Sequence, residues 1–163
     1  MLYFAYGSNL QEVRFNSRIR AEFKSLAVLR GYRLVFHKPG AGNSGKATII
    51  LDGGSSTEGA LFAYSEQDHQ ILKKIEAGYS VVEITVHTSN GDVRALTFIA
   101  DALDPSLLPF DWYVALIVDG GRRLGLSAAY LARLEALPTK IDPDAERSAR
   151  EWAFIRGPAS NPS

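Results

Sequence analysis

The sequence predicts an α+β fold in which a strand-rich first part precedes a helical second part. From residue 2 to residue 100, short runs of apolar and β-branched residues alternate with polar ones, and glycine, asparagine and aspartate separate these runs. After Asp101 the apolar residues recur every three or four positions, which indicates amphipathic helices. No internal repeat or clean boundary interrupts the chain, so we expect one domain over residues 1–156 and a disordered tail over residues 157–163.

Composition excludes several classes of protein. The chain of 163 residues has no cysteine, which rules out disulfides, thiol nucleophiles and thiolate metal sites. Eighteen basic residues balance 18 acidic ones, so no overall charge attracts nucleic acid or an anionic membrane. The start does not resemble a signal peptide, and no apolar run is long enough to cross a bilayer. We therefore expect a cytoplasmic protein, a monomer or homodimer, that binds neither nucleic acid nor membranes.

The first strand leads directly into a polar loop. Residues Leu2–Tyr6 form an apolar and aromatic run with high strand propensity, and Gly7, Ser8 and Asn9 follow it. If the chain continues as a helix, as the amphipathic pattern of Leu10–Arg20 predicts, the backbone N–H groups of the loop converge on one point. Such a point suits a small acidic ligand.

The middle of the chain contains a misleading nucleotide-binding motif. Residues Gly40–Lys46 match the phosphate-loop pattern G-x-x-x-x-G-K, but Ala47 stands where that loop needs Ser or Thr. A strand-like run, Ala47–Leu51, follows in place of the required helix, and a strand over Ala27–Phe36 precedes. We therefore expect a glycine-rich connection between two strands. A turn at Asp52–Gly54 and another strand, Thr57–Tyr64, come next.

Glu76 stands at an unusual position for a carboxylate. Ser65 is expected to cap a helix that ends near Gly78, so Glu76 lies in the last turn, at the negative end of the helix dipole. A residue placed against local preference is a candidate for function. Tyr79 opens the next strand three positions later, and a hairpin of Tyr79–His87 and Asp92–Ala100 follows.

Three helices are expected to close the chain. Asp111 can cap the first, in which Gly120 within the apolar stripe indicates the close approach of another backbone, and which ends at Gly125. Ser127 caps the second. Pro143 starts the last, which extends to about Trp152.

Elimination leaves little machinery for catalysis. His37, His69 and His87 are scattered and have no acidic ligand cluster, so we expect no metal and no cofactor. Ser8 lacks the second glycine of a hydrolase nucleophile elbow. What remains is an anion-holding loop, the carboxylate of Glu76 and several tyrosines.

Three ordered motifs carry a family resemblance. Residues Tyr3–Leu10 resemble the Tyr-Gly-Ser-Asn signature of the γ-glutamylcyclotransferase-like (AIG2-like) proteins. Residues Leu72–Gly78 are similar to that family's Leu-Asp-x-x-Glu-Gly segment, although Lys73 replaces the usual Asp and Ala77 the usual Gly. Residues Pro109–Gly120 and the segment after them resemble the closing helices of the family.

The resemblance implies both a fold and an activity. The fold is a small mixed β-barrel flanked by helices, with the active-site cavity at one end of the barrel. The activity is intramolecular acyl transfer, in which a γ-glutamyl amide cyclises to 5-oxoproline and releases an amine or amino acid. Glu76 is then the catalytic general base and acid, and the substrate-binding residues are Tyr3, Tyr6, Gly7, Ser8, Asn9, Leu10, Tyr113 and Tyr79.

Several alternatives stay open at this stage. The departures at Lys73 and Ala77 also fit a non-catalytic module on the same fold that binds a small molecule or a protein. The leaving group is an amino acid, a polyamine-like amine or a γ-glutamyl-protected metabolite. The amides of the loop hold either the developing oxyanion or the α-carboxylate of the substrate.

Overall fold

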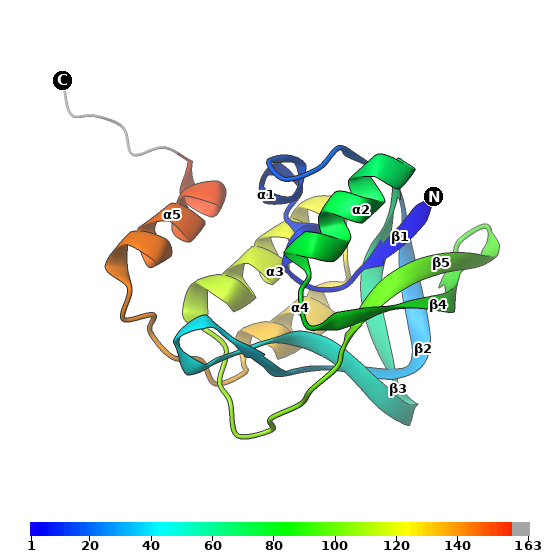
Figure 1. Ribbon diagram of the computed structural model, residues 1–163. Helices are drawn as coiled ribbons and strands as arrows, with labels where there is room; N and C mark the ends of the chain where they lie inside the picture. Colours follow the sequence, from blue (N-terminus) through cyan, green and yellow to red (C-terminus); the bar gives the residue numbers. More distant parts are fainter. Residues whose placement is uncertain (158–163) are drawn as a thin grey trace.

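The computed structural model describes residues 1–157, which form a closed five-stranded barrel with helices around it (Figure 1). The order of the strands is β1-β3-β2-β4-β5. Their bounds are Leu2–Ala5 (β1), Ala21–Gly40 (β2), Ser44–Tyr64 (β3), Tyr79–Thr88 (β4) and Gly91–Ala100 (β5). Strand β1 pairs parallel with β5 and antiparallel with β3, and the pairs β2–β3, β2–β4 and β4–β5 are antiparallel. The predicted mixed barrel with flanking helices is confirmed.

Two serines and a glycine mark helix ends where the sequence predicted them. Their bounds are Glu12–Asn16 (α1), Glu66–Ile75 (α2), Asp111–Leu124 (α3), Ala128–Glu135 (α4) and Ala145–Arg156 (α5), with short 3₁₀ turns at Ser8–Leu10 (η1) and Ala41–Asn43 (η2). The predicted caps Ser65 and Ser127 accept hydrogen bonds from the third amide of their helices, and Gly125 ends α3 with φ 103°. Asp111 is not the N-cap of α3, because Phe110 holds that position.

Strands β2 and β3 form one long hairpin. Strand β3 continues through Asp52–Gly54, where the sequence pattern predicted a turn. Arg30 pairs with Ser56 and Tyr32 with Leu51, so residues 52–55 bulge out opposite Gly31, whose φ is 79°. The Asp52 carboxylate accepts a hydrogen bond of 2.8 Å from the Ser55 hydroxyl and thereby closes a local loop. Turn-forming residues therefore build a bulge inside β3 and do not reverse the chain.

The glycine-rich segment Gly40–Lys46 forms the closed end of this hairpin, as the sequence predicted. Turn η2 reverses the chain with Gly42 and Asn43 both at positive φ, and β3 follows at once. The Lys140 ammonium donates to the carbonyl oxygen of Gly42 at 3.2 Å, which ties the turn to the segment after α4. A phosphate loop needs a helix at this point, and a strand stands there.

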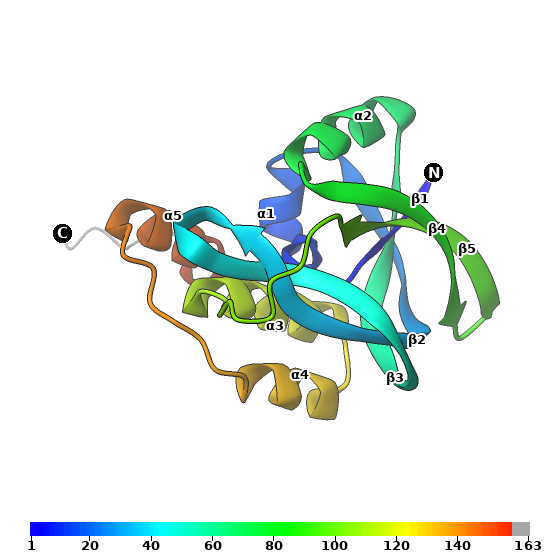
Figure 2. The same ribbon diagram turned by 60° about the horizontal axis from the view of Figure 1, so that its bottom comes forward.

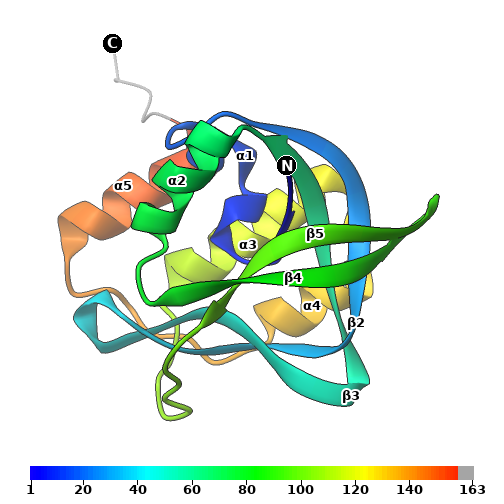
Figure 3. The same ribbon diagram turned by 45° about the vertical axis from the view of Figure 1, so that its right-hand side comes forward.

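Helix α3 is the most deeply buried helix and supports the site. Leu116 and Ile117 are fully buried in the core. Figure 2 shows α3 and α4 on one side of the barrel and α2 on another, and Figure 3 shows α3 behind the first strand and its loop. None of the helices within residues 1–157 is both long and apolar enough to cross a membrane. Gly157 follows α5, and the rest of the predicted tail lies outside the described residues.

Candidate active site

Glu76 lies at the end of α2 and reaches the loop that follows β1. Its amide donates to the carbonyl oxygen of Leu72 at 2.8 Å, which makes Glu76 the C-cap of the helix. The side chain is half-buried, and its Oε1 accepts a hydrogen bond of 3.0 Å from the Asn9 amide group. Residues 67 positions apart thus meet, and a carboxylate at the negative end of a helix gains a compensating donor.

The loop after β1 is a short 3₁₀ turn fixed from behind by α3. The Leu10 amide donates to the Gly7 carbonyl oxygen at 3.0 Å, and no side chain caps the turn. A Cβ on Gly120 of α3 would lie 2.3 Å from the carbonyl carbon of Leu10, so only glycine lets the helix approach this closely. This confirms the close approach predicted at Gly120.

Asn9 joins the loop to the catalytic candidate. Its side chain is buried, with 4% of the residue exposed, and its Nδ2 donates both to the Tyr3 hydroxyl at 3.1 Å and to Glu76. Because a carboxylate only accepts, this pair of bonds fixes which end of the amide carries the nitrogen. The opposite atom, Oδ1, is buried and has no hydrogen-bond partner among residues 1–157. Asn9 therefore faces Glu76 with its nitrogen and keeps an unused acceptor on the other side of the same buried amide group.

Four tyrosines form the wall of the site. They are Tyr3, Tyr6, Tyr79 and Tyr113. Burial raises the pKa of each hydroxyl well above its usual value, and the nearby charge of Glu76 raises each pKa further. All four hydroxyls consequently stay protonated and neutral at physiological pH.

Hydrogen bonds to the barrel hold three of these rings in place. The Tyr79 hydroxyl donates to the Ala47 carbonyl oxygen at 2.8 Å, and the Ala47 amide donates to the Tyr113 hydroxyl at 3.1 Å. The Tyr6 hydroxyl donates to the carbonyl oxygen of Phe98. One residue of β3, Ala47, thus positions two tyrosines from different elements.

These groups surround one small cavity at the end of the barrel. Its lining residues are Tyr3, Tyr6, Gly7, Ser8, Asn9, Ala47, Glu76, Tyr79, Phe98 and Tyr113. Its volume of about 30 Å³ has room for only one or two water molecules, so a larger ligand requires the lining side chains to move. The structure thus brings Glu76 and seven of the eight predicted binding residues together.

Leu10 is the exception and corrects the prediction. Its side chain is fully buried in the core and does not line the cavity, because the 3₁₀ turn directs it inward toward α3. Sequence reasoning missed two lining residues, Ala47 and Phe98. In the sequence, Ala47 marks only a departure from the phosphate-loop pattern, and the alternation of Asp92–Ala100 does not indicate which face meets the cavity.

Comparisons with known proteins agree with this architecture. The family model described as the AIG2-like family matches residues 56–134. A γ-glutamylcyclotransferase of Bos taurus is 30% identical over 146 residues, which cover 83% of this chain and 78% of that protein. A solved structure described as a γ-glutamyl cyclotransferase matches with a TM-score of 0.80 at 26% identity, and the match covers 92% of this chain and 98% of the other.

The chain belongs to the γ-glutamylcyclotransferase family. A second relative of that description, from Homo sapiens, is 29% identical over 147 residues and has the same coverage. The family predicted from the three motifs is therefore confirmed. Lys73 and Ala77, where this chain departs from the motif of the γ-glutamylcyclotransferases, are both exposed, and neither lines the cavity.

Arg14 adds a cation beneath the loop that the sequence did not reveal. Its guanidinium is buried, donates to the Ser8 hydroxyl at 3.2 Å and pairs with the carboxylate of Glu151 at 2.6 Å. Glu151 lies in α5, 137 positions away. An arginine in a short amphipathic helix gives no sign of such a distant partner, so no local pattern could have found this contact.

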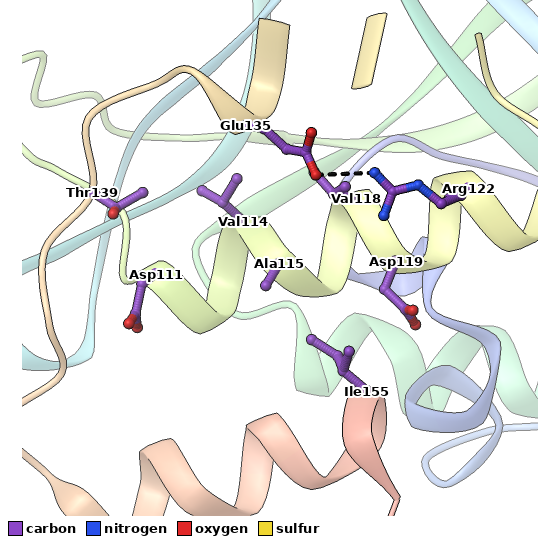
Figure 4. Close-up of a pocket in the computed structure, with 9 residues that line it drawn as sticks. All are labelled: Asp111, Val114, Ala115, Val118, Asp119, Arg122, Glu135, Thr139 and Ile155. Atoms are coloured by element: carbon purple, nitrogen blue, oxygen red, sulfur yellow. Dashed lines mark hydrogen bonds and ion pairs between the residues drawn. The ribbon is translucent and has the colours of Figure 1, made fainter. Parts of the chain in front are cut away.

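A second, larger hollow lies on α3, and Glu76 does not line it (Figure 4). Its volume is about 300 Å³, and Asp111, Val114, Ala115, Val118, Asp119, Arg122, Glu135, Thr139 and Ile155 line it. Its charged groups are largely paired with protein: Arg122 binds Glu135 at 3.0 Å, and Asp119 binds Arg123 at 3.0 Å. None of the predicted site residues lines it, and size alone does not make it the active site. Across residues 1–157, no three side chains of metal-ligating type gather in one place.

Proposed function

We propose that this protein cyclises a γ-glutamyl amide to 5-oxoproline and releases the amine, with Glu76 moving the protons. A γ-glutamyl amide carries both the nucleophile, its α-amine, and the electrophile, its γ-carbonyl carbon. The reaction therefore needs no enzyme nucleophile. Holding the substrate in a bent conformation can supply about 7 kcal/mol or more of the barrier by effective molarity.

One observation carries the proposal: the Glu76 carboxylate lines one cavity with the loop after β1 and receives a single side-chain hydrogen bond from the described residues, from Asn9, so it has lone pairs left for a ligand. An α-ammonium group is a donor with three hydrogens and fits the free lone pairs of this carboxylate. The anion of Glu76 favours the charged amine on binding and is placed to remove its proton. Buried and neutral tyrosines around it keep water away from the reacting atoms.

The step conserves atoms and charge. The α-nitrogen attacks the γ-carbonyl carbon, the ring C–N bond forms and the amide C–N bond breaks. Two protons move in total from the α-nitrogen to the departing nitrogen, with Glu76 as the carrier, so the amine leaves as an ammonium ion. The loop Gly7–Asn9 supplies backbone N–H groups for the developing oxyanion or for the α-carboxylate.

The test is the variant Glu76→Gln, assayed for 5-oxoproline with a panel of γ-glutamyl amino acids and γ-glutamyl amines. Turnover should fall by about two orders of magnitude or more, because glutamine keeps the contact with Asn9 but cannot carry a proton. Glu83→Gln is the matched control, since Glu83 is exposed on β4 and paired with Arg94.

Two results would contradict the proposal. Turnover of Glu76→Gln within a few fold of the wild type would remove Glu76 from the mechanism. Binding of γ-glutamyl compounds by the wild type without release of 5-oxoproline from any of them would favour the non-catalytic binding module.

A further inference from the structure

Three half-buried cations lie near the cavity, and the proposed reaction does not use them. They are Arg18, which follows α1, Lys38 of β2 and Lys46 of β3, and we call them the cationic rim. Lys46 is the lysine of the misleading phosphate-loop motif.

Lys38 and Lys46 are placed against local preference. The two residues are direct partners in the antiparallel pairing of β2 and β3, where like charges opposite each other destabilise a sheet. Elsewhere on the same hairpin, Arg33 of β2 pairs with Asp52 of β3 at 3.1 Å. An anion bound near the two lysines would therefore relieve their repulsion, and the hairpin itself does not provide one.

Contacts place Lys38 next to the site. The ammonium of Lys38 lies 5.1 Å from the centroid of the Tyr79 ring, which lines the cavity. A Cβ on Gly78, two positions after Glu76, would lie 3.2 Å from the same ammonium. Figures 1 and 3 show the β2–β3 hairpin running below the connection from α2 to β4, which carries Glu76. Lys38 thus lies beside the cavity, and its partner Lys46 directly precedes the lining residue Ala47 on β3.

Electrostatics agree with this placement. Burial lowers the pKa of Lys46, the charge of Glu76 opposes that shift, and Lys38, Arg14 and Arg18 add to it. Burial also lowers the pKa of Arg18, with Arg14 adding to the shift and Glu76 opposing it. Lys46 and Arg18 therefore both lie within reach of the charge of Glu76.

The rim lacks counter-charges of its own. Within residues 1–157, none of its three cations forms an ion pair, whereas Arg14 is already paired with Glu151. Holding cations half-buried without an anion costs free energy that a bound anion would recover.

We propose that the cationic rim binds the leaving group, and that the preferred substrates are γ-glutamyl compounds whose leaving group carries two carboxylates, such as an acidic amino acid. This inference rests on the proposed function, which places the α-amine against Glu76 and Asn9 at the inner end of the cavity. The leaving group then extends toward the cationic rim. A polyamine-like leaving group would meet three cations with further positive charge and is disfavoured.

The experiment compares three donors: γ-glutamyl-glutamate, its near-isostere γ-glutamyl-glutamine and γ-glutamyl-ethylamide. The wild type should show a kcat/KM about tenfold or more higher for γ-glutamyl-glutamate than for γ-glutamyl-glutamine, as expected for one extra charge-assisted contact. In Lys46→Gln, Lys38→Gln and the double variant, this ratio should fall toward one. Lys24→Gln is the matched control, because Lys24 lies on β2 but is exposed and paired with Glu22, and it should keep the wild-type ratio. Circular dichroism and thermal unfolding verify that each variant is folded.

The outcomes separate this inference from the proposed function. Failure to release 5-oxoproline from any donor rejects the proposed function. If 5-oxoproline is released with equal kcat/KM from the first two donors, the role of the rim is rejected and the proposed function stands. A loss in the lysine variants that is equal for all three donors also overturns it, since the rim would then bind the α-carboxylate that all three share.

Discussion

The carboxylates of Glu76 and Asp142 have opposite surroundings. Asp142 is buried and accepts hydrogen bonds from the indole of Trp112 at 2.9 Å, the amide of Asp144 at 2.9 Å and two nitrogens of Arg147. Those bonds, led by the bond from Arg147, lower the pKa of Asp142 to about 2. Glu76 is only half-buried and receives one side-chain hydrogen bond from the described residues, from Asn9, whose own oxygen is unused.

The difference shows how the chain divides its polar groups. A carboxylate whose lone pairs are all used by the protein has no capacity left for a ligand, and it stabilises the fold by joining α3, α5 and the segment between α4 and α5. A carboxylate with unused lone pairs beside an unused acceptor weakens the fold locally and is ready for a donor. Substitutions at the two places should therefore separate stability from turnover.

Among the changes that test this comparison, Asn9→Leu is expected to have the largest effect. Leucine has a similar volume but removes both the bond to Glu76 and the free acceptor, so kcat/KM for a γ-glutamyl amide should fall about 100-fold. The free energy of unfolding should change by less than about 1 kcal/mol, because an unsatisfied buried acceptor disappears together with the lost bonds. Kinetics and urea unfolding of the same preparation measure both quantities. Turnover within threefold of the wild type would show that Asn9 only fills space.

The reverse pattern is expected from Asp142→Asn. An amide cannot form the ion pair with Arg147, so the free energy of unfolding should fall by about 2 kcal/mol. Asp142 does not line the cavity, and kcat/KM per folded molecule should stay at the wild-type value. Urea unfolding followed by tryptophan fluorescence reports this loss, since Trp112 contacts the substituted group. An unchanged midpoint would mean that the saturated cluster contributes nothing to stability.

Sequence reasoning found the parts of the site that local preferences reveal. Glu76 stood out because an anion ends a helix at the unfavourable pole, and Gly7-Ser8-Asn9 because turn residues follow a buried strand directly. Tyr79 follows Glu76 by only three positions, which predicts that the two residues lie near each other. Each of these signals lies within one element or its immediate neighbour.

Contacts between distant residues could not be found in this way. Trp112 and Asp142 are 30 positions apart, and Gln11 donates to the carbonyl oxygen of Phe154 from 143 positions away. The bulge at residues 52–55 uses the same residue types as a chain reversal, so its sequence alone does not distinguish the two. Three-dimensional packing determines these features, and the periodicity of the sequence does not reflect that packing.

The smallest expected effect is a dependence of the unfolding free energy on pH. Asp142 has a pKa of about 2 in the folded chain against an ordinary value of 3.8, so its contribution is complete above pH 4 and is lost as the pH falls toward 2. The difference in unfolding free energy between wild type and Asp142→Asn should therefore stay constant from pH 7 to about pH 4 and shrink below it. Urea unfolding of both proteins at a series of pH values measures it. A difference that already declines between pH 7 and pH 5 would place the titrating group elsewhere, because the depressed pKa of Asp142 cannot act in that range.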